Sequence, residues 1–498
     1  MDPRHDLRPF SLNGTPGTMS SDAQQRSRHP DGYFAMTRRA SVLTFLGAAQ
    51  TVTGSRFLIE SNSGKLLIDA GLFQGQKHLR LRNWEPFPID PSTLDGVVLT
   101  HAHLDHSGYL PALVRAGFSG SIWATPSTVA LTKIVLEDSA RLQEEEAEYA
   151  NRKGFSKHRP ALPLYTSDDA AQAIAQLREV GFDQPTEVAE GMCAELFPAG
   201  HILGSASALL TFASNRRLLV TGDVGRPNHP ILNPPRPRPD ADVILVESTY
   251  GNRLHEPEQN ALDRISQVIN RTARRGGSVV IPAFAVDRTE VILHTLRSLK
   301  TDERIPDLPV YVDSPMALAV LDVYRRAIEG RDPEVRLESC LADPFDPGRL
   351  HEARTTAESK ALNELRYPSI IISSSGMATG GRVLHHLYQR LPDPRNAVVL
   401  VGFQADGTRG QLLAAGASTI KLLGRHVPVR AEVAVVDAFS VHADADELVD
   451  WLAPATRPET AYVVHGEPTA STALASRLHW ELEWTAVVPN HGECVRLD

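Results

Sequence analysis

The sequence predicts an α/β fold in which one domain is interrupted by a second domain. Apolar strand-like runs that end in Asp, Glu or His occur before residue 251 and again after residue 440. Between them, strand-like and helical runs alternate, which is typical of a mostly parallel sheet covered on both faces. At 498 residues the chain is also too long for one ordinary domain. We expect four segments: a disordered tail (1–37), the outer domain's first part (38–251), the inserted domain (252–440) and the outer domain's second part (441–498).

Composition narrows the class of protein. The chain is 42% hydrophobic and 22% charged, and no apolar run approaches the roughly 20 residues that cross a bilayer. We therefore expect no membrane contact. Its formal charge of −9 argues weakly against nucleic-acid binding. Residues 252–440, however, hold nearly equal numbers of basic and acidic side chains, so a local basic groove stays open.

The tail and the cysteines predict the compartment. Residues 1–37 are rich in Arg, Pro, Ser and Asp and lack an apolar segment, so they indicate a disordered tail rather than a secretion signal, with Met36 as an alternative start. Cys193, Cys340 and Cys494 lie far apart without paired spacing. This argues against disulfides and thiolate zinc sites and favours a reducing cytoplasm.

The first three elements expected along the chain are strands. Residues 41–60 alternate apolar and polar side chains, which predicts a hairpin, and residues 65–69 form a third strand that ends at Asp69. An acid that closes a buried strand is usually a cap or a turn former. Asp69 by itself therefore carries no functional assignment.

The densest cluster of candidate ligands follows the apolar strand 94–99 and precedes the helical run 109–116. Three imidazoles and one carboxylate fall within six residues: His101, His103, Asp105 and His106. At a strand-to-helix turn, the first two can face one metal ion and the last two its neighbour. Nitrogen and oxygen ligands without thiolate suit zinc, or another borderline divalent ion, in an open catalytic site. A polar turn that is only exposed to solvent would not need so many candidate ligands within six residues.

Further candidates occur singly at strand ends. After helical runs at 126–153 and 168–180, strands are expected to end at His201, Asp223 and Glu247. A lone His or Asp after a strand is more often structural than catalytic. Asp223 is nevertheless suited to bridge two ions about 3.5–4 Å apart, because a carboxylate has two oxygens.

The inserted domain is predicted to contain helices at 257–275, 287–299 and 315–329 and strands at 278–282, 309–313, 369–372 and 397–401. Small residues then lead into a helix at 383–391. Converging backbone N–H groups there could seat a phosphate, although the run could also be only a turn. The residues of this candidate seat are Ser374, Ser375, Gly376, Gly380, Gly381 and Arg382. His385 and His386 are expected to be packing or surface residues.

Beyond the insertion, the chain is expected to return to the outer domain. Strand-like runs 433–442 and 460–465 end in His442 and His465, with a helix at 445–452 between them. A second His-Gly-Glu triplet begins at His491, but it follows Pro-Asn rather than a long apolar strand. We therefore exclude His491 from the site.

The order of these motifs resembles the β-CASP branch of the metallo-β-lactamase superfamily, over about residues 40–498. The resemblance rests on the Glu-Ser-Thr-Tyr-Gly turn at 247–251, the domain inserted after it, and the Ser-x-His and Val-His-Gly-Glu motifs that end at His442 and Glu467. Within this branch, the chain most resembles bacterial and archaeal relatives of the 73-kDa endonuclease subunit of the cleavage and polyadenylation specificity factor. We find in it no KH module, which the archaeal members carry. It implies a metallo-β-lactamase αββα sandwich with an inserted β-CASP α/β domain.

The resemblance also implies roles. Asp69 would hold a metal-bound water or a ligand histidine, and Glu247 would steady His442 as the proton donor. Two Zn²⁺ ions per chain, with Mn²⁺ as the alternative, would activate water for phosphodiester hydrolysis. The implied substrate is single-stranded RNA, cut internally to leave a 3′-hydroxyl and a 5′-phosphate, with trimming from an end in some relatives. One ion would be held by His101, His103 and His201, and the other by Asp105, His106 and His465, with Asp223 shared.

Two other functions stay open. A hydrolase of thioesters or lactams with the same fold would need an open pocket, which the long insertion disfavours. A non-catalytic RNA-binding scaffold would be expected to show gaps in the ligand set, and the sequence shows none. The sequence also leaves a homodimer open.

Overall fold

The computed structural model describes residues 41–154, 156–337, 343–402, 404–405, 407–436 and 439–497. Two compact units divide the chain, residues 1–38 and 39–498, and the described residues belong to the second. The predicted tail and Cys340 lie outside the described residues. Within the described part, no helix is both long enough and apolar enough to span a bilayer.

Two sheets of seven described strands each form the centre of the outer domain. Their facing side chains, including Phe45, Ile68, Leu210 and Leu245, share one buried apolar cluster. The first sheet has the order β22 (Cys494–Arg496), β1 (Val42–Phe45), β2 (Phe57–Glu60), β3 (Lys65–Ile68), β4 (Gly96–Val98), β5 (Ser121–Ala124) and β6 (Leu177–Glu179). The second has the order β21 (Ala486–Val487), β20 (Thr460–Val464), β11 (Val243–Glu247), β10 (Arg217–Val220), β9 (Ala206–Phe212), β8 (Met192–Pro198) and β7 (Thr186–Ala189).

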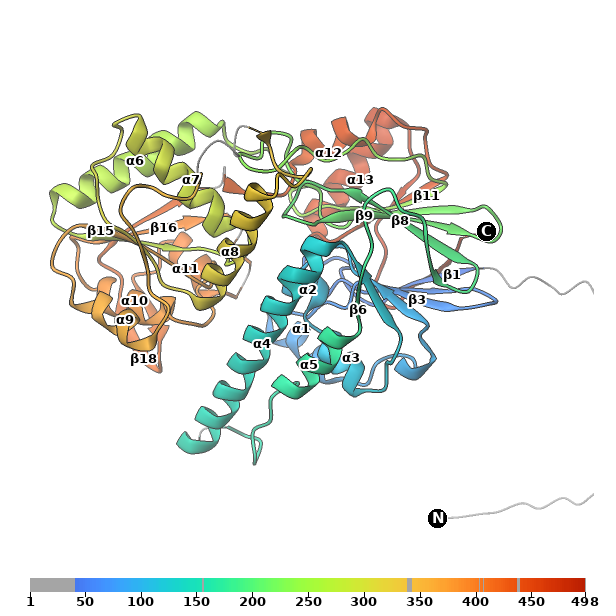
Figure 1. The fold of residues 1–498 in the computed structure, drawn as a ribbon, viewed down its shortest axis with the longest axis horizontal. Helices are drawn as coiled ribbons and strands as arrows, with labels where there is room; N and C mark the ends of the chain where they lie inside the picture. The colour runs from blue at the N-terminus through green and yellow to red at the C-terminus, as the bar shows by residue number, and fades with distance from the viewer. Residues whose placement is uncertain are drawn as a thin grey trace, which may run out of the picture. The chain divides into compact units, whose positions relative to one another are not determined.

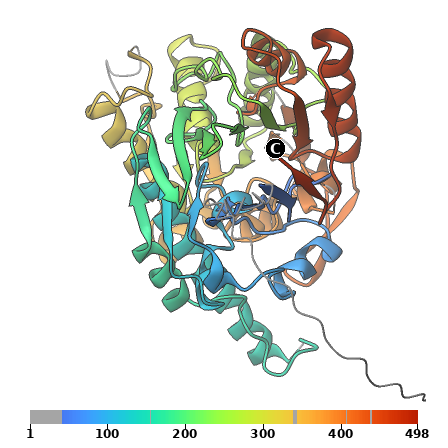
Figure 2. The same cartoon turned by 90° about the vertical axis from the view of Figure 1, so that its right-hand side faces the viewer.

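Helices cover the outer face of each sheet, which completes four layers. Leu113 and Leu136 pack against the first sheet in one buried cluster, and Leu448 and Leu474 against the second in another. Figure 2 shows the two helix layers on opposite sides of the strands. The helices of the first layer are α1 (Lys77–Leu81), α2 (Leu104–Ser107), α3 (Leu110–Arg115), α4 (Pro126–Lys153) and α5 (Ser167–Ala175), and those of the second are α12 (Ala445–Leu452) and α13 (Pro468–Leu482).

The inserted domain is a parallel sheet with helices on both faces, as the alternating pattern predicts (Figure 1). Val279 and Ile281 face one apolar cluster, whereas Val280 between them faces another, because neighbouring side chains on a strand point to opposite faces. The strand order is β14 (Leu350–Glu352), β13 (Val310–Val312), β15 (Ser369–Ser373), β12 (Ser278–Pro282), β16 (Ala397–Val401) and β19 (Glu432–Val436). The helices are α6 (Glu258–Arg274), α7 (Arg288–Thr301), α8 (Pro315–Glu329), α9 (Thr356–Ala361), α10 (Val383–Arg390) and α11 (Arg409–Ala414), and a small hairpin joins β17 (Thr419–Leu422) to β18 (Arg425–Pro428).

Two predicted elements are wrong in part. The helix expected at 168–180 ends at Ala175, and Leu177–Glu179 instead forms β6, which pairs with β5. The strand expected to return to the outer domain at residue 433 is β19, which extends the inserted sheet by pairing with β16. Both errors concern short strands, whose partners only the tertiary structure supplies.

Candidate metal centre

Strand topology brings the predicted ligands to one place. β10, β11 and β20 are neighbours with parallel pairing, so the residues at or just after their carboxyl ends meet at one edge of the second sheet. These residues are Asp223, Glu247 and His465. In the first sheet, β3 and β4 are also parallel, which places Asp69 beside the loop that carries His101. That loop runs into α2, which carries Asp105 and His106.

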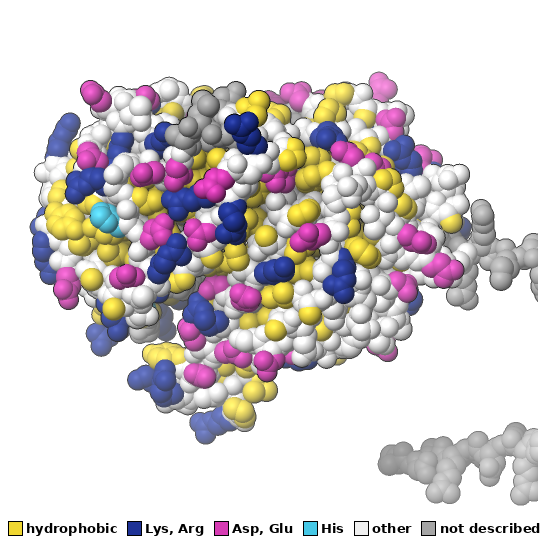
Figure 3. Space-filling model, viewed as in Figure 1, with side chains coloured by type: hydrophobic (Ala, Val, Ile, Leu, Met, Phe, Trp, Pro, Cys, Tyr) yellow, Lys and Arg dark blue, Asp and Glu magenta, His cyan; other side chains and the backbone are white. Residues whose placement is uncertain are grey.

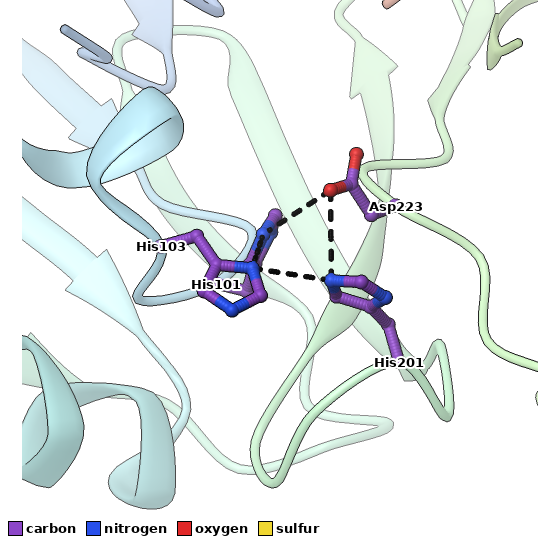
Figure 4. Close-up of side chains that lie close together, drawn as sticks. All are labelled: His101, His103, His201 and Asp223. Carbon is purple, nitrogen blue, oxygen red and sulfur yellow. Dashed lines mark hydrogen bonds and ion pairs between the residues drawn. The ribbon is translucent and has the colours of Figure 1, made fainter. Parts of the chain in front are cut away.

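The first group of ligands consists of His101, His103, His201 and Asp223 (Figure 4). His103 Nδ1 lies 3.2 Å from His101 Nε2 and 3.2 Å from His201 Nε2. Asp223 Oδ2 lies 3.4 Å from His101 Nε2 and 3.6 Å from His201 Nε2. Four ligand atoms therefore point toward one common centre.

The second group consists of Asp105, His106 and His465. His106 Nε2 lies 3.1 Å from His465 Nε2, and Asp105 Oδ2 lies 3.5 Å from the same His465 nitrogen. The other carboxylate oxygen of Asp223, Oδ1, lies 3.4 Å from His106 Nε2. Asp223 thus directs one oxygen to each group.

The chemistry of these groups fits divalent metal ions. Ligand atoms about 2.0–2.1 Å from a tetrahedral zinc are about 3.3–3.4 Å apart, close to the distances observed here. Among the described residues, no donor makes a hydrogen bond of good geometry to the buried Asp223 Oδ1. A buried carboxylate oxygen without a hydrogen bond is costly unless a cation meets it. The site therefore has the properties of a metal centre, and the identity of the metal belongs to the proposal below.

Electrostatics favour the metal-binding forms of His101, His201 and Asp223. At His106 the carboxylates of Asp223 and Asp69 outweigh the effect of burial and raise the pKa well above its usual value. Burial is the main cause that lowers the pKa of His101 and of His201 well below the usual value, so both imidazoles are neutral. Burial opposes ionisation of Asp223, but the neighbouring imidazoles, first His465 and then His106, hold its pKa well below the usual range. Neutral imidazole and ionised carboxylate are the forms that bind metal.

Asp69 fixes the orientation of a ligand histidine. Its Oδ2 lies 2.6 Å from His106 Nδ1, and its Oδ1 accepts a hydrogen bond from the Thr100 N–H at 2.8 Å. With Nδ1 bound to the carboxylate, Nε2 of His106 faces the second group of ligands. A carboxylate behind a histidine in this way sets the tautomer and ring orientation at metal sites.

Glu247 and His442 form a pair beside the first group. His442 Nδ1 lies 3.2 Å from Glu247 Oε1, which also accepts the Val224 N–H at 2.7 Å. His442 Nδ1 is also 3.9 Å from Asp223 Oδ2. Burial lowers the pKa of His442, but Glu247 and Asp223 outweigh this effect and raise it above the usual value. The pair can therefore hold a proton at the edge of the metal centre.

His103, Asp105, Asp223, His442 and His465 line a cleft of about 2230 Å³ to which both domains contribute. The candidate phosphate seat faces the same cleft through Ser374, Ser375 and Arg382. Gly376 is absent from the lining, and a Cβ there would come within 2.7 Å of the Phe284 side chain. The role of the seat stays a prediction.

Sequence reasoning missed Asp313, a buried acid at the end of β13. Its Oδ1 accepts a hydrogen bond from Arg382 at 2.7 Å, and its Oδ2 lies 2.6 Å from His386 Nε2. The guanidinium of Arg382 is therefore already paired with a carboxylate. The signal was present, because Asp313 closes a predicted strand as Asp69 and Asp223 do.

Family models match three consecutive parts of the chain. Residues 52–268 match the metallo-beta-lactamase superfamily, residues 289–413 the Beta-Casp domain, and residues 426–489 the Zn-dependent metallo-hydrolase RNA specificity domain. A crystal structure of a protein of unknown function from Enterococcus faecalis V583 covers 92% of this chain, with 100% of its own chain matched, a TM-score of 0.50 and 13% identity. That likeness concerns the fold alone.

Curated relatives match over most of their length. Ribonuclease TTHA0252 from Thermus thermophilus is 38% identical over 433 residues, which cover 87% of this chain and 94% of that protein. Transcription termination factor FttA from Pyrococcus abyssi is 30% identical over 476 residues, which cover 91% of this chain and 71% of that protein. Together with the family models, these matches confirm what the order of the motifs predicts: the chain belongs to the β-CASP family of the metallo-β-lactamase superfamily.

Proposed function

We propose that this chain is a metal-dependent ribonuclease that hydrolyses phosphodiester bonds of single-stranded RNA in the cytoplasm. The observation that carries the proposal is the position of Asp223, whose two oxygens face two groups of ligands at one cleft. The name of the Thermus relative supports RNA as the substrate. A site for two Zn²⁺ ions, or for Mn²⁺ in their place, is the arrangement that the ligand types favour.

The proposed assignment of ligands follows the two groups. His101, His103 and His201 would hold one ion, and Asp105, His106 and His465 the other, with Asp223 shared. Bound there, the ions would supply Lewis acidity and water activation for attack on a phosphodiester phosphorus. Asp69 would keep His106 in the tautomer that ligates through Nε2.

Glu247 and His442 would deliver the proton that the leaving group needs. When the P–O3′ bond breaks, the O3′ atom must gain a proton, and the fragments then carry a 3′-hydroxyl and a 5′-phosphate. The carboxylate at His442 Nδ1 favours the protonated imidazole and leaves Nε2 to donate. This division of labour resembles other carboxylate–histidine pairs, in which the acid orients the ring and stabilises its charge.

The cleft offers cations for the RNA backbone. Figure 3 shows basic and acidic side chains interspersed on one face of the molecule, so local cations rather than the general surface would attract phosphates. Exposed Trp84 also lines the cleft and could stack on an unpaired base. The basic side chains that line the cleft include Arg80, Arg82, Lys360, Arg409 and Lys421.

The test is cleavage of labelled RNA by the purified protein with Zn²⁺ or Mn²⁺. We expect wild type to cut a linear RNA blocked at its 5′ end and also a circular RNA, which requires internal cleavage. Asp223→Ala should abolish both reactions. Asp240→Ala, at an exposed carboxylate that accepts the Thr456 N–H, should leave them unchanged. Equal cleavage by wild type and Asp223→Ala would contradict the assignment.

Two outcomes would favour other functions. Hydrolysis of thioesters or lactams with intact RNA would indicate a small-molecule hydrolase. Tight RNA binding with well under two metal ions per chain and no cleavage would indicate a scaffold. Cleavage of the linear RNA without cleavage of the circle would restrict the proposal to an exonuclease.

A further inference from the structure

The loop that carries His201 is held from the inserted domain as well as from its own. It runs from Gly200 to Ser205 between β8 and β9, and two of its glycines have left-handed backbones, Gly200 with φ +65° and Gly204 with φ +82°. Glycine adopts this region readily and loses much conformational freedom when it is fixed. Within the loop, the Ser205 hydroxyl accepts the N–H groups of His201 at 3.0 Å and Ile202 at 3.2 Å, and contacts from outside hold the N–H groups of Leu203 and Gly204.

Two buried side chains of the inserted domain accept hydrogen bonds from this loop. The Leu203 N–H donates to the Tyr324 hydroxyl at 3.0 Å, and the Gly204 N–H donates to Glu334 Oε2 at 2.9 Å. Tyr324 is fully buried and Glu334 is 8% exposed. The carbonyl of Gly204 faces the outer domain, where it accepts the hydroxyl of Thr128 at 2.7 Å. The loop is thus held from both domains.

Each of the two residues is itself fixed in place. The Tyr324 hydroxyl donates to Asp287 Oδ1 at 2.7 Å, and Asp287 Oδ2 lies 3.0 Å from Nε2 of the outer-domain His229. The backbone of Glu334 is also paired, because its carbonyl accepts the Asn233 N–H at 2.8 Å. Tyr324 cannot move away from the loop without breaking its bond to Asp287, and the backbone pairing of Glu334 fixes the point from which its side chain reaches Gly204.

Apolar packing joins the same parts. Ile202 and Leu203 belong to one continuous buried cluster with Tyr324, Val335 and Phe345 of the inserted domain. The Arg336 N–H also donates to the Ile231 carbonyl at 2.8 Å, which ties the two domains together beside the loop. The domain that lines the cleft therefore also contacts the loop that carries a candidate metal ligand, at Leu203 and Gly204.

We propose that Tyr324 and Glu334 are positioning residues for His201, so that the inserted domain holds one metal site as well as lining the substrate cleft. This inference rests on the proposed role of His201 as a metal ligand. Groups that orient a metal ligand commonly change metal affinity by 10–100-fold when they are removed. The effect should fall on the ion held by His101, His103 and His201 and spare the ion held by Asp105, His106 and His465.

The experiment compares Tyr324→Phe, Glu334→Ala and Glu334→Gln in the full-length protein. Metal affinity is measured without RNA, by competition of each protein with a chromophoric chelator for Zn²⁺ and by the visible spectrum of the Co²⁺-loaded form. We expect Tyr324→Phe and Glu334→Ala to weaken one of the two ions by about tenfold or more. Glu334→Gln, which keeps an oxygen for the Gly204 N–H, should retain affinity near that of wild type.

A matched control is Tyr311→Phe. It removes a tyrosine hydroxyl of the same domain that forms a hydrogen bond with Tyr367 instead of with the loop. It should leave both ions unchanged. Wild-type affinity for both ions in Tyr324→Phe and Glu334→Ala would overturn the inference. Equal loss of both ions, or failure of Glu334→Gln to rescue, would show a general structural role and overturn it too.

RNA cleavage separates this inference from the proposed function. If wild type cuts RNA and the variants bind metal normally, the positioning role fails alone. If one ion is weakened as expected but wild type cuts no RNA, the ribonuclease assignment fails and the positioning role stands. In an active enzyme, the expected signature is a lower kcat at an unchanged KM for RNA.

Discussion

Asp69 Oδ2 and His106 Nδ1 are 2.6 Å apart in the protein interior, and this contact fixes which imidazole nitrogen faces the metal centre. Asp69 directly follows β3, and His106 lies on the short helix α2, which comes after the neighbouring parallel strand β4. Asp69 itself has a φ of +58°, a conformation uncommon for a residue with a side chain. The backbone therefore adopts a strained shape where this carboxylate meets its histidine.

The first prediction concerns Asp69. Asp69→Asn keeps the size of the side chain but removes its charge, so it should hold His106 less firmly and weaken the ion bound through His106 by about 10–100-fold. Competition with a chelator measures this affinity. Asp90→Asn, at an exposed cap of a short helix, is the control and should bind both ions as wild type does. Unchanged affinity in Asp69→Asn would contradict the orienting role.

The second prediction separates proton donation from metal binding. His442→Ala should lower kcat by about 10²–10⁴-fold, the usual contribution of a positioned acid, while both ions and the KM for RNA are retained. Metal analysis of the purified variant and steady-state kinetics check this. His479→Ala, at a histidine on α13, should behave as wild type. Loss of metal from His442→Ala would mean that His442 is a ligand instead.

The third prediction follows from the raised pKa of Glu334. Burial, with a smaller effect from Asp332, raises the pKa of Glu334 to about 8. A raised pKa means that the folded state binds this proton more tightly than the unfolded state. Its stabilising effect is complete below the unfolded pKa near 4.5 and is lost as the pH rises to about 8.

Glu334→Gln should remove this pH dependence. The free energy of unfolding of wild type should fall relative to the variant between about pH 4.5 and pH 8, and denaturant titrations at several pH values measure the difference. Parallel curves for the two proteins across this range would show that the Glu334 carboxyl titrates normally.

The fourth prediction tests the cations of the cleft. Lys360→Ala with Lys421→Ala should raise the KM for RNA and reduce the slope of log affinity against log salt by about 0.7 for each phosphate that is no longer neutralised. A double variant at Lys133 and Lys153 of α4, which lie outside the cleft lining, is the control. An unchanged salt slope in the cleft variant would place the RNA elsewhere.

The fifth prediction concerns the core between the two sheets. Leu210 is fully buried on β9, so Leu210→Ala should lower the free energy of unfolding by about 2–5 kcal/mol. Leu337 is 76% exposed, and Leu337→Ala should change the free energy of unfolding by less than about 0.5 kcal/mol. Chemical denaturation gives both values, and equal losses would contradict the burial of Leu210.

Local patterns in the sequence were sufficient for much of the fold. The helix over 126–153 has the predicted bounds, because its signals are local: Thr125 caps it, Pro126 starts it and Gly154 ends it with φ +67°. The His101–His106 cluster was equally visible, since its ligands adjoin one another in the chain. The end of the helix predicted at 168–180 was not visible in the local sequence, because β6 exists only through its pairing with β5.

The sequence by itself determined the family, the succession of strands and helices, and the residues that could bind metal, because each depends on neighbours along the chain or on the order of motifs. Only the tertiary structure decided how Asp223 divides its oxygens between two groups, that Asp313 occupies the guanidinium of Arg382, and that Tyr324 and Glu334 hold the loop of His201. These relationships join residues far apart in the chain. Their distances follow from sheet pairing and domain packing, which no local pattern encodes.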